Sequence, residues 1–196
     1  MSNETHAALL VMDLQEGIVA SVGADEFPVI ENIQRAIDSA RLHDVPIYFV
    51  TLGFRNGHPE VNPRNRMFAG IAQAGAFKRG SPDAAIHSAL APADGDQVVV
   101  KLRVSAFAGS DLEVLLRARD IDTLVLTGIS TSGVVLSTAR EAADKDFRLV
   151  VLSDGCFDPD PDVHAALTEK VFTRQADVLN VDDWIERLDK TTSVPT

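Results

Sequence analysis

The chain has 196 residues, of which 45% are hydrophobic and 24% charged, so it can bury a sizeable core, and we expect residues 1–196 to form a single domain. Its formal net charge is -11 and its basic residues are scattered, which argues against a nucleic-acid partner, because phosphate binding needs a basic patch. No apolar stretch approaches the roughly 20 residues that cross a bilayer, so we expect no membrane partner either.

Six short apolar runs predict the strands of a sheet. They are rich in Val, Leu and Ile, and several are continuous rather than alternating, which is typical of strands buried on both faces of a parallel sheet. In chain order they are Ala7–Met12, Pro46–Thr51, Gln97–Val100, Thr123–Thr127, Arg148–Leu152 and the weaker Ala176–Asn180.

Helical patterns lie between these runs. In Phe27–Leu42, for example, apolar residues recur at the spacing of a helix. The alternation of strand and helix predicts βαβ units with right-handed crossovers and therefore an α/β fold. The other predicted helices are Ala84–Leu90, Asp111–Arg119, Ser132–Ala143, Pro161–Val171 and Val181–Leu188.

One connection, from Leu52 to Asp96, is too long for a simple crossover. Its first part, residues 53–68, is rich in Gly, Pro, Asn and Arg. Long irregular connections in compact domains often form lids or binding loops, although a surface excursion without chemical importance fits this composition equally well. The sequence leaves both interpretations open.

The cysteine content and the N-terminus indicate the compartment. Cys156 has no second cysteine to pair with, which fits a reducing environment. The opening residues MSNETHAALLVMD lack the basic region of a secretory signal peptide, and their apolar run contains an acid. The sequence therefore predicts a cytoplasmic protein.

Polar residues at the carboxyl ends of the predicted strands indicate where chemistry would occur, because open parallel sheets bind ligands at that edge. Asp13 ends the first strand, Lys101 ends the third, and the turn after Gly128 follows the fourth. An acid and a base at the same end of neighbouring strands can pair, and the ammonium would hold the aspartate ionised. In the alternative interpretation, Asp13 caps a turn and Lys101 extends along the sheet edge into solvent.

Three separated motifs carry a resemblance to a known family. The runs LLVMDLQ, VVVKLRVSAFAGSDLEVLLR and IDTLVLTGISTSGVVLSTAREAADKDFRLVVLSDGCFDPDPDVHAAL resemble the isochorismatase-like hydrolases, over a span from about Ala7 to Trp184. The resemblance implies a Rossmann-like three-layer sandwich with a parallel sheet of about six strands. It also implies a homo-oligomer, either a dimer or a tetramer.

The resemblance also implies roles for single residues. Most of the superfamily uses an aspartate, a lysine and a cysteine, and the first two correspond to Asp13 and Lys101. The backbone amides of Ser130 and Val134 would form an oxyanion or anion hole, next to a cis peptide bond between Ile129 and Ser130. Val134 stands where the family has its nucleophilic cysteine, so the usual thioester mechanism would not be possible.

Chemistry without that cysteine is still conceivable. The isochorismatases proper use the aspartate as a general acid, with water completing the hydrolysis, and Asp13 with Lys101 would suffice for that reaction. Cys156 lies after the next strand and is interpreted as a structural thiol. A serine nucleophile at Ser130 or Ser132 is a further alternative, with Asp13 as its only evident base.

No metal or cofactor is expected, and the substrate is expected to be a small metabolite. Metal-binding members of the superfamily carry an aspartate and a histidine just after the second strand, where this chain has Gly53, Phe54 and Arg55. Arg55 and Arg64 could bind an anionic group, because a guanidinium matches a carboxylate, although solvated loop arginines are an equal alternative. The expected substrate contacts are Gln15, Phe54, Arg55, Phe107 and Thr131.

Two functions remain open at this point. The first is an isochorismatase-like hydrolase that acts on a small metabolite, which could be anionic, by aspartate general acid/base catalysis without a cysteine nucleophile. The second is an inactive relative of the cysteine amidases that binds small molecules or serves as a scaffold, which the loss of the nucleophile would also explain.

Overall fold

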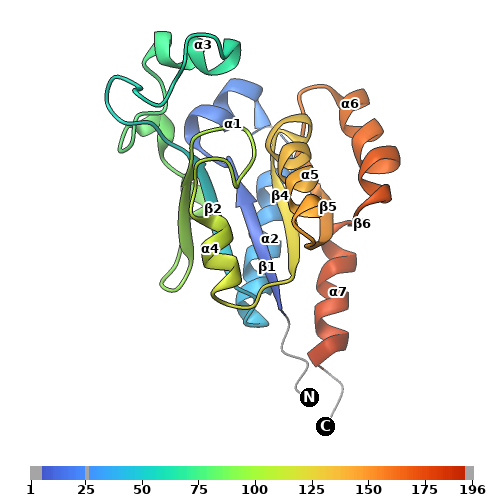
Figure 1. The fold of residues 1–196 in the computed structure, drawn as a ribbon. Helices are drawn as coiled ribbons and strands as arrows, with labels where there is room; N and C mark the ends of the chain where they lie inside the picture. The colour runs from blue at the N-terminus through green and yellow to red at the C-terminus, as the bar shows by residue number, and fades with distance from the viewer. Residues whose placement is uncertain (1–5, 25–26, 193–196) are drawn as a thin grey trace.

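The computed structural model describes residues 6–24 and 27–192, which form a six-stranded sheet (Figure 1). All neighbouring strands run parallel, in the order β3-β2-β1-β4-β5-β6. The predicted α/β fold is thereby confirmed, and the strand order is that of a dinucleotide-binding fold. The strands are β1 (Ala7–Met12), β2 (Ile47–Leu52), β3 (Gln97–Lys101), β4 (Thr123–Ile129), β5 (Arg148–Phe157) and β6 (Asp177–Leu179).

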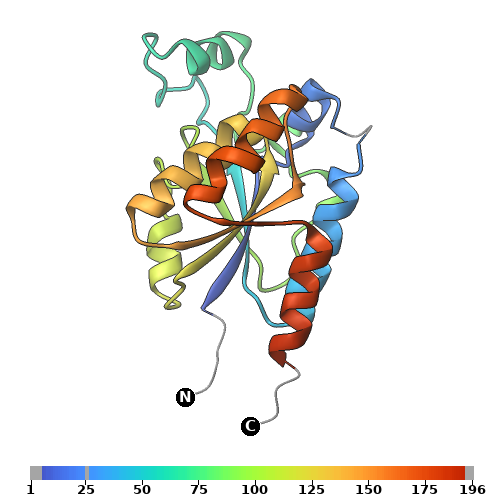
Figure 2. The same ribbon diagram turned by 90° about the vertical axis from the view of Figure 1, so that its right-hand side faces the viewer.

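Helices cover both faces of the sheet, which gives the three layers that the sequence predicts (Figure 2). One pair packs on one face and a second pair on the other, and each pair encloses its own cluster of buried apolar side chains. The first pair is α2 (Val29–Leu42) and α7 (Val181–Thr192), and the second is α4 (Leu112–Arg117) and α5 (Leu136–Asp144).

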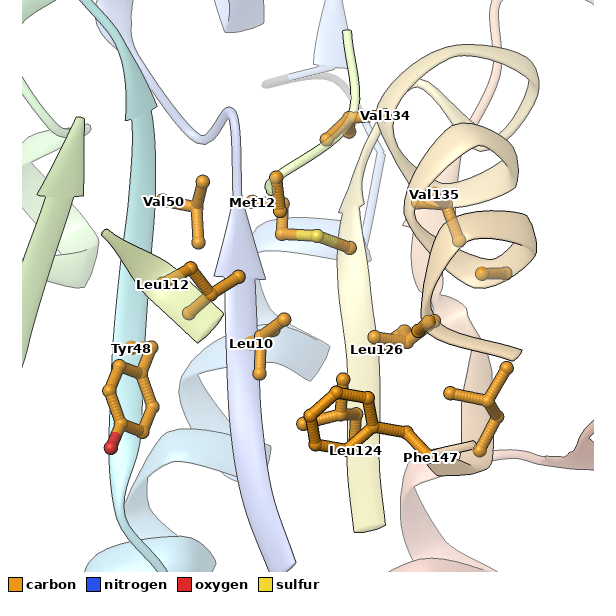
Figure 3. Close-up of a cluster of buried hydrophobic side chains, with 14 of the residues drawn as sticks. Leu10, Met12, Tyr48, Val50, Leu112, Leu124, Leu126, Val134, Val135 and Phe147 are labelled. Carbon is orange, nitrogen blue, oxygen red and sulfur yellow. The ribbon is translucent and has the colours of Figure 1, made fainter. Parts of the chain in front are cut away.

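Strand β1 shows why both faces need a cover. Leu9 and Val11 are buried in the cluster beneath α2 and α7, whereas Leu10 and Met12 are buried in the cluster beneath α4 and α5 (Figure 3). Successive residues of a strand point to opposite faces, so a continuous apolar run fits only a sheet covered on both sides.

Two helices that the sequence pattern did not predict lie near the carboxyl edge of the sheet. They are α1 (Glu16–Val22) and α3 (Arg66–Ala74). Each ends at a glycine in the left-handed conformation, Gly23 for α1 and Gly75 for α3, which is a common way to end a helix. The N-terminus of α3 is capped by Asn65, whose side chain accepts the N–H of Phe68.

The helix predicted over Ala84–Leu90 is wrong. Two short 3-10 turns, Pro82–Ala84 and Ser88–Leu90, flank an extended stretch instead. The backbone oxygen of Ala85 accepts a hydrogen bond from the N–H of Glu16 (2.9 Å). A contact with the start of α1 therefore replaces the local hydrogen bond that a helix would make at this carbonyl.

Two predicted helices and one strand differ from the expectation in extent. The helix predicted over Ser132–Ala143 begins with a π-helical turn, Thr131–Val135, before α5. The helix predicted over Pro161–Val171 is α6 (Pro161–Ala166) followed by a second π-helical turn. Strand β5 continues to Phe157, beyond its predicted end, with a register shift against β4.

The long connection between β2 and β3 carries α3 and lies beyond the carboxyl edge of the sheet (Figures 1 and 2). Phe54 joins the start of the connection to its middle: its N–H donates to the oxygen of Phe77 (2.9 Å), and its oxygen accepts the N–H of Arg79 (2.9 Å). Phe54 and Phe68 also pack with Leu52 in a small apolar cluster. The connection is therefore folded on its own core rather than extended over the surface.

Across the parts of the chain that the structure describes, no helix combines the length and apolarity needed to cross a membrane.

Gly128 allows β1 and β4 to approach each other closely. It pairs with Met12, has φ of 148°, and a Cβ placed on it would overlap the backbone oxygen of Met12. We expect Gly128→Ala to lower the free energy of unfolding by about 2 kcal/mol, as overpacking does, measured by urea denaturation. The control is Gly70→Ala in α3, where a Cβ meets open space and stability should rise slightly. Equal stabilities of the two variants would contradict this account.

Candidate functional site

Asp13 follows β1 directly, at the point where the strand order reverses between β1 and β4. Its φ is 58°, a left-handed conformation that aspartate adopts more readily than most residues. Its N–H donates to the oxygen of Val50 in β2 (2.8 Å), which fixes the turn. Non-glycine residues held in this conformation often occur at functional sites.

Lys101 is the partner of Asp13. Its Nζ lies 3.0 Å from Oδ2 of Asp13 and donates a second hydrogen bond to the backbone oxygen of Arg103 (2.9 Å). The lysine side chain is only 2% exposed, so solvent hardly screens the pair. The expectation of neighbouring strands is corrected, because β2 lies between β1 and β3 and the lysine side chain extends past the end of β2.

Burial raises the pKa of Asp13 above its ordinary value. Desolvation opposes the charged carboxylate more strongly than the charge of Lys101 and its hydrogen bond favour it. Lys101 therefore favours the ionised form of Asp13, as expected, but only partly offsets the effect of burial. Oδ1 of Asp13 is buried and accepts no hydrogen bond from the described residues. A carboxyl group in this state can serve as a proton donor.

A cavity of about 220 Å³ lies against the Asp13–Lys101 pair. Its volume is below the roughly 300–1,000 Å³ of pockets for drug-sized ligands, so it suits a smaller molecule. Asp13 and Lys101 are the charged residues of its lining, and Ser21 and Ser130 are its uncharged polar side chains. The rest of the lining is apolar apart from Gly133.

The turn after β4 forms another part of the lining. The peptide bond between Ile129 and Ser130 is cis, and Ser130, Gly133 and Val134 all border the cavity. A Cβ on Gly133 would lie 2.7 Å from Oγ of Ser130, so the turn is tightly folded. The carboxylate of Asp158 accepts the N–H of Ser132 (2.8 Å) and anchors the turn from the other side.

Three polar residues expected to contact a substrate lie outside the cavity lining, which corrects that expectation. Gln15 is fully buried, and its amide bonds to Leu52 and to the oxygen of Ala84. Arg55 has a side chain that is 64% exposed and pairs with Glu60. Thr131 is buried, with Oγ1 2.9 Å from Nδ1 of His164.

The two aromatic residues expected at the substrate are also outside the lining, and this expectation is corrected as well. Phe54 is fully buried in the cluster with Phe68. Phe107 belongs to the large core beneath α4 and α5, where its ring stacks on Phe147. Phe54 is thus used in the small core of the long connection and Phe107 in the main core of the domain.

The walls of the cavity come mostly from residues that the sequence reasoning did not single out. Ile18 and Val22 of α1 face it, as do Met67 and Ile71 of α3, two pairs at the spacing of one helical turn. That spacing is the signal that could have revealed them, because it marks one face of a helix. Phe68 and Phe77 complete the wall on the side of the long connection.

Cys156 and the strand-end Asp154 take no part in this cavity. Cys156 lies in the core beneath α4 and α5, and burial raises the pKa of its thiol to about 12. The carboxylate of Asp154 accepts the N–H of Val181 (2.8 Å) at the start of α7. Ser132 is exposed and also outside the lining, whereas Ser130 borders it.

Among the residues that the structure describes, no group of three histidine, cysteine or acidic side chains is placed to hold a metal ion.

Residues 7–183 match the family model described as the Isochorismatase domain. The chain belongs to the isochorismatase family. Its sequence is 32% identical over 181 residues to the isochorismatase family protein YwoC of Bacillus subtilis, covering 92% of this chain and 93% of that protein.

The chain is also similar to a curated amidase and to a solved structure. The chain is 32% identical over 163 residues to an N-carbamoylsarcosine amidase from Arthrobacter, covering 82% of this chain and 61% of the amidase. The crystal structure of a cysteine hydrolase from Pseudomonas syringae superposes with a TM-score of 0.86, at 24% identity, over 95% of this chain and 94% of that one. At that identity the likeness concerns the fold.

The buried thiol gives a direct prediction. We expect iodoacetamide at neutral pH to leave Cys156 of the native protein unmodified, because a pKa of about 12 leaves almost no thiolate. Mass spectrometry measures the modification, and the same protein unfolded in urea is the control, in which the cysteine should react fully. Rapid alkylation of the native protein would contradict the assignment of Cys156 as a structural residue.

Proposed function

We propose that this protein is a hydrolase in which Asp13 acts as a general acid and no cysteine nucleophile takes part. The observation that carries the proposal is the carboxyl of Asp13, which borders the cavity, has a raised pKa and carries one oxygen without a hydrogen-bond partner among the described residues. The membership in a family of hydrolases supports it.

The mechanism follows from what borders the cavity. We assign Val134 to the position at which relatives named cysteine hydrolases carry their nucleophile, and a valine side chain cannot attack a carbonyl. Amide hydrolysis, which the name of the Arthrobacter relative implies for that protein, would need such a nucleophile or an activated water. Ser130 borders the cavity, but no histidine stands in the lining to activate it.

A general acid suffices for a bond that breaks once a carbon atom is protonated, as in a vinyl ether. Asp13 would transfer its proton to the terminal carbon of the double bond, leaving an oxocarbenium ion. A water molecule would add to that cation and return a proton to Asp13. The hemiacetal then collapses to an aldehyde and an alcohol, so hydrolysis is complete without a covalent intermediate.

The neighbours of Asp13 would each help this step. The ammonium of Lys101, 3.0 Å from Oδ2, would stabilise the carboxylate that remains after proton transfer. We assign the backbone amides of Ser130 and Val134 to the binding of a substrate oxygen, since both residues border the cavity beside Asp13. Because burial opposes the charged carboxylate, Asp13 keeps its proton to a higher pH than an exposed aspartate does.

The first test is Asp13→Asn, which keeps the size of the side chain but removes the acid. Two vinyl ethers serve as probes, uncharged butyl vinyl ether and anionic vinyloxyacetate, since each releases acetaldehyde on hydrolysis. We expect the native protein to hydrolyse at least one, and Asp13→Asn to lower kcat/KM at least about 100-fold. The control is Asp154→Asn, which removes a carboxylate outside the cavity and should leave the rate unchanged.

Hydrolysis of neither probe by the native protein, or undiminished hydrolysis by Asp13→Asn, would overturn the proposed function. In that case the inactive binding protein suggested by the loss of the nucleophile would be the better description.

The second test is the pH dependence of kcat/KM. A raised pKa keeps Asp13 protonated at pH values where an ordinary aspartate is ionised. We therefore expect kcat/KM to be constant at low pH and to fall as the pH rises through the raised pKa, after subtraction of the rate without enzyme. Circular dichroism over the same range verifies that the fold is intact. A rate that instead rises with pH would point to a deprotonated nucleophile.

A further inference from the structure

We propose that the substrate of this site is a small, uncharged molecule with an apolar body, rather than an anionic metabolite. The inference deepens the function proposed above and rests on it for the reaction. It concerns the part of the substrate that does not react, which must lie against the walls of the cavity while the reacting group lies at Asp13.

The walls carry no charge of their own. Of the residues that line the cavity, only Asp13 and Lys101 are ionisable, and they are paired with each other. Lys101 is 2% exposed and already bonded to Asp13 and to the oxygen of Arg103. A substrate carboxylate on the remaining N–H of Lys101 would lie beside Asp13, in the place that the reacting group needs, so Lys101 does not serve the rest of the substrate.

The arginines of the long connection are held elsewhere. Arg55 pairs with Glu60, and Arg64 bonds to the side chain of Asn62. Neither borders the cavity, which removes the basis for expecting an anionic substrate.

Two further arginines near the same connection are engaged with the backbone. Arg79 donates from Nε to the oxygen of Gly53 (3.3 Å). Arg103 donates to the oxygens of Leu102 and Glu60, and its guanidinium lies 5.3 Å from the ring centroid of Phe68. Neither arginine lines the cavity, so the ring of Phe68, which does line it, presents an apolar surface there.

An anionic group against the apolar walls of this cavity would lose water without gaining a partner. Burial of an isolated carboxylate against apolar side chains is strongly unfavourable, whereas an uncharged ligand gains free energy from the apolar area that it covers. The apolar side chains that would favour an uncharged ligand over an anion are those of α1, Ile18 and Val22, and those of the long connection, Met67, Ile71 and Phe77.

The aromatic part of the wall is held in place before any ligand binds. Phe77 has φ of 54°, and its N–H donates to Oδ2 of Asp83 (2.6 Å). The other carboxylate oxygen of Asp83 accepts the hydroxyl of Ser81. A Cβ on Gly17 would lie 3.2 Å from the ring of Phe77, so α1 packs closely behind it. The ring therefore has little room to move aside for a charged group and its water.

Binding of unreactive ligands tests the inference separately from the reaction. Butyl ethyl ether and ethoxyacetate are saturated counterparts of the two vinyl ethers, equal to each other in size and different in charge. We expect isothermal titration calorimetry to give a dissociation constant at least about tenfold lower for the uncharged ether. Equal or tighter binding of ethoxyacetate, or binding of neither ligand, would overturn the inference whatever the outcome of the hydrolysis assay.

A charge placed at the cavity mouth should change this preference. Met67 lines the cavity and is 60% exposed, so Met67→Arg should fold and bring a guanidinium to the entrance. We expect this variant to bind ethoxyacetate at least about fivefold more tightly than the native protein does. Gln73→Arg adds the same charge to the exposed part of α3, outside this lining, and should leave the affinity unchanged.

An equal gain in both variants would mean that the overall charge of the protein, not the lack of a cation in the cavity wall, decides the preference, and this would overturn the inference. If the uncharged ether binds more tightly but neither vinyl ether is hydrolysed, the substrate class stands and the proposed reaction fails.

Discussion

The burial of a carboxyl group beside an ammonium at the carboxyl edge of the sheet is the constraint on which the site depends. Moving either charge out of water costs several kcal/mol, and the pair recovers this only if the two groups meet closely. The parallel register allows that meeting, because Met12 is level with Val50 and Val99, and Lys101, the last residue of β3, lies two residues further along. Desolvation still prevails at Asp13 and raises its pKa, which makes it a proton donor.

The same edge is shaped by packing that has no chemical role. Gly128 allows β4 to lie against the backbone of Met12, and the turn that follows is folded tightly enough that Gly133 contacts Ser130. Val134 belongs to the buried core beneath α4 and α5 as well as to the cavity lining (Figure 3). The side chain of Val134 thus belongs both to the core and to the cavity lining, and it has no reactive atom.

The cavity itself is a product of segments outside the sheet. Helices α1 and α3 and the residues around Phe77 turn the open edge of a parallel sheet into a partly covered, mostly apolar cavity. The arginines of the long connection, which could have bound an anionic substrate, do not line this cavity. Arg55 pairs with Glu60, and Arg64 bonds to Asn62. The two ionisable side chains of the lining, Asp13 and Lys101, are therefore paired with each other in a cavity whose other walls are mostly apolar.

The sequence by itself determined the strands, the parallel sheet and the positions of Asp13 and Lys101, because buried strands are continuous apolar runs and a polar residue at their end stands out. Only the tertiary structure decided what surrounds that pair. Gln15 and Thr131 are polar residues close in sequence to the site, yet their hydrogen bonds are used inside the fold. The orientation of a loop side chain depends on distant partners, and the local pattern does not contain them.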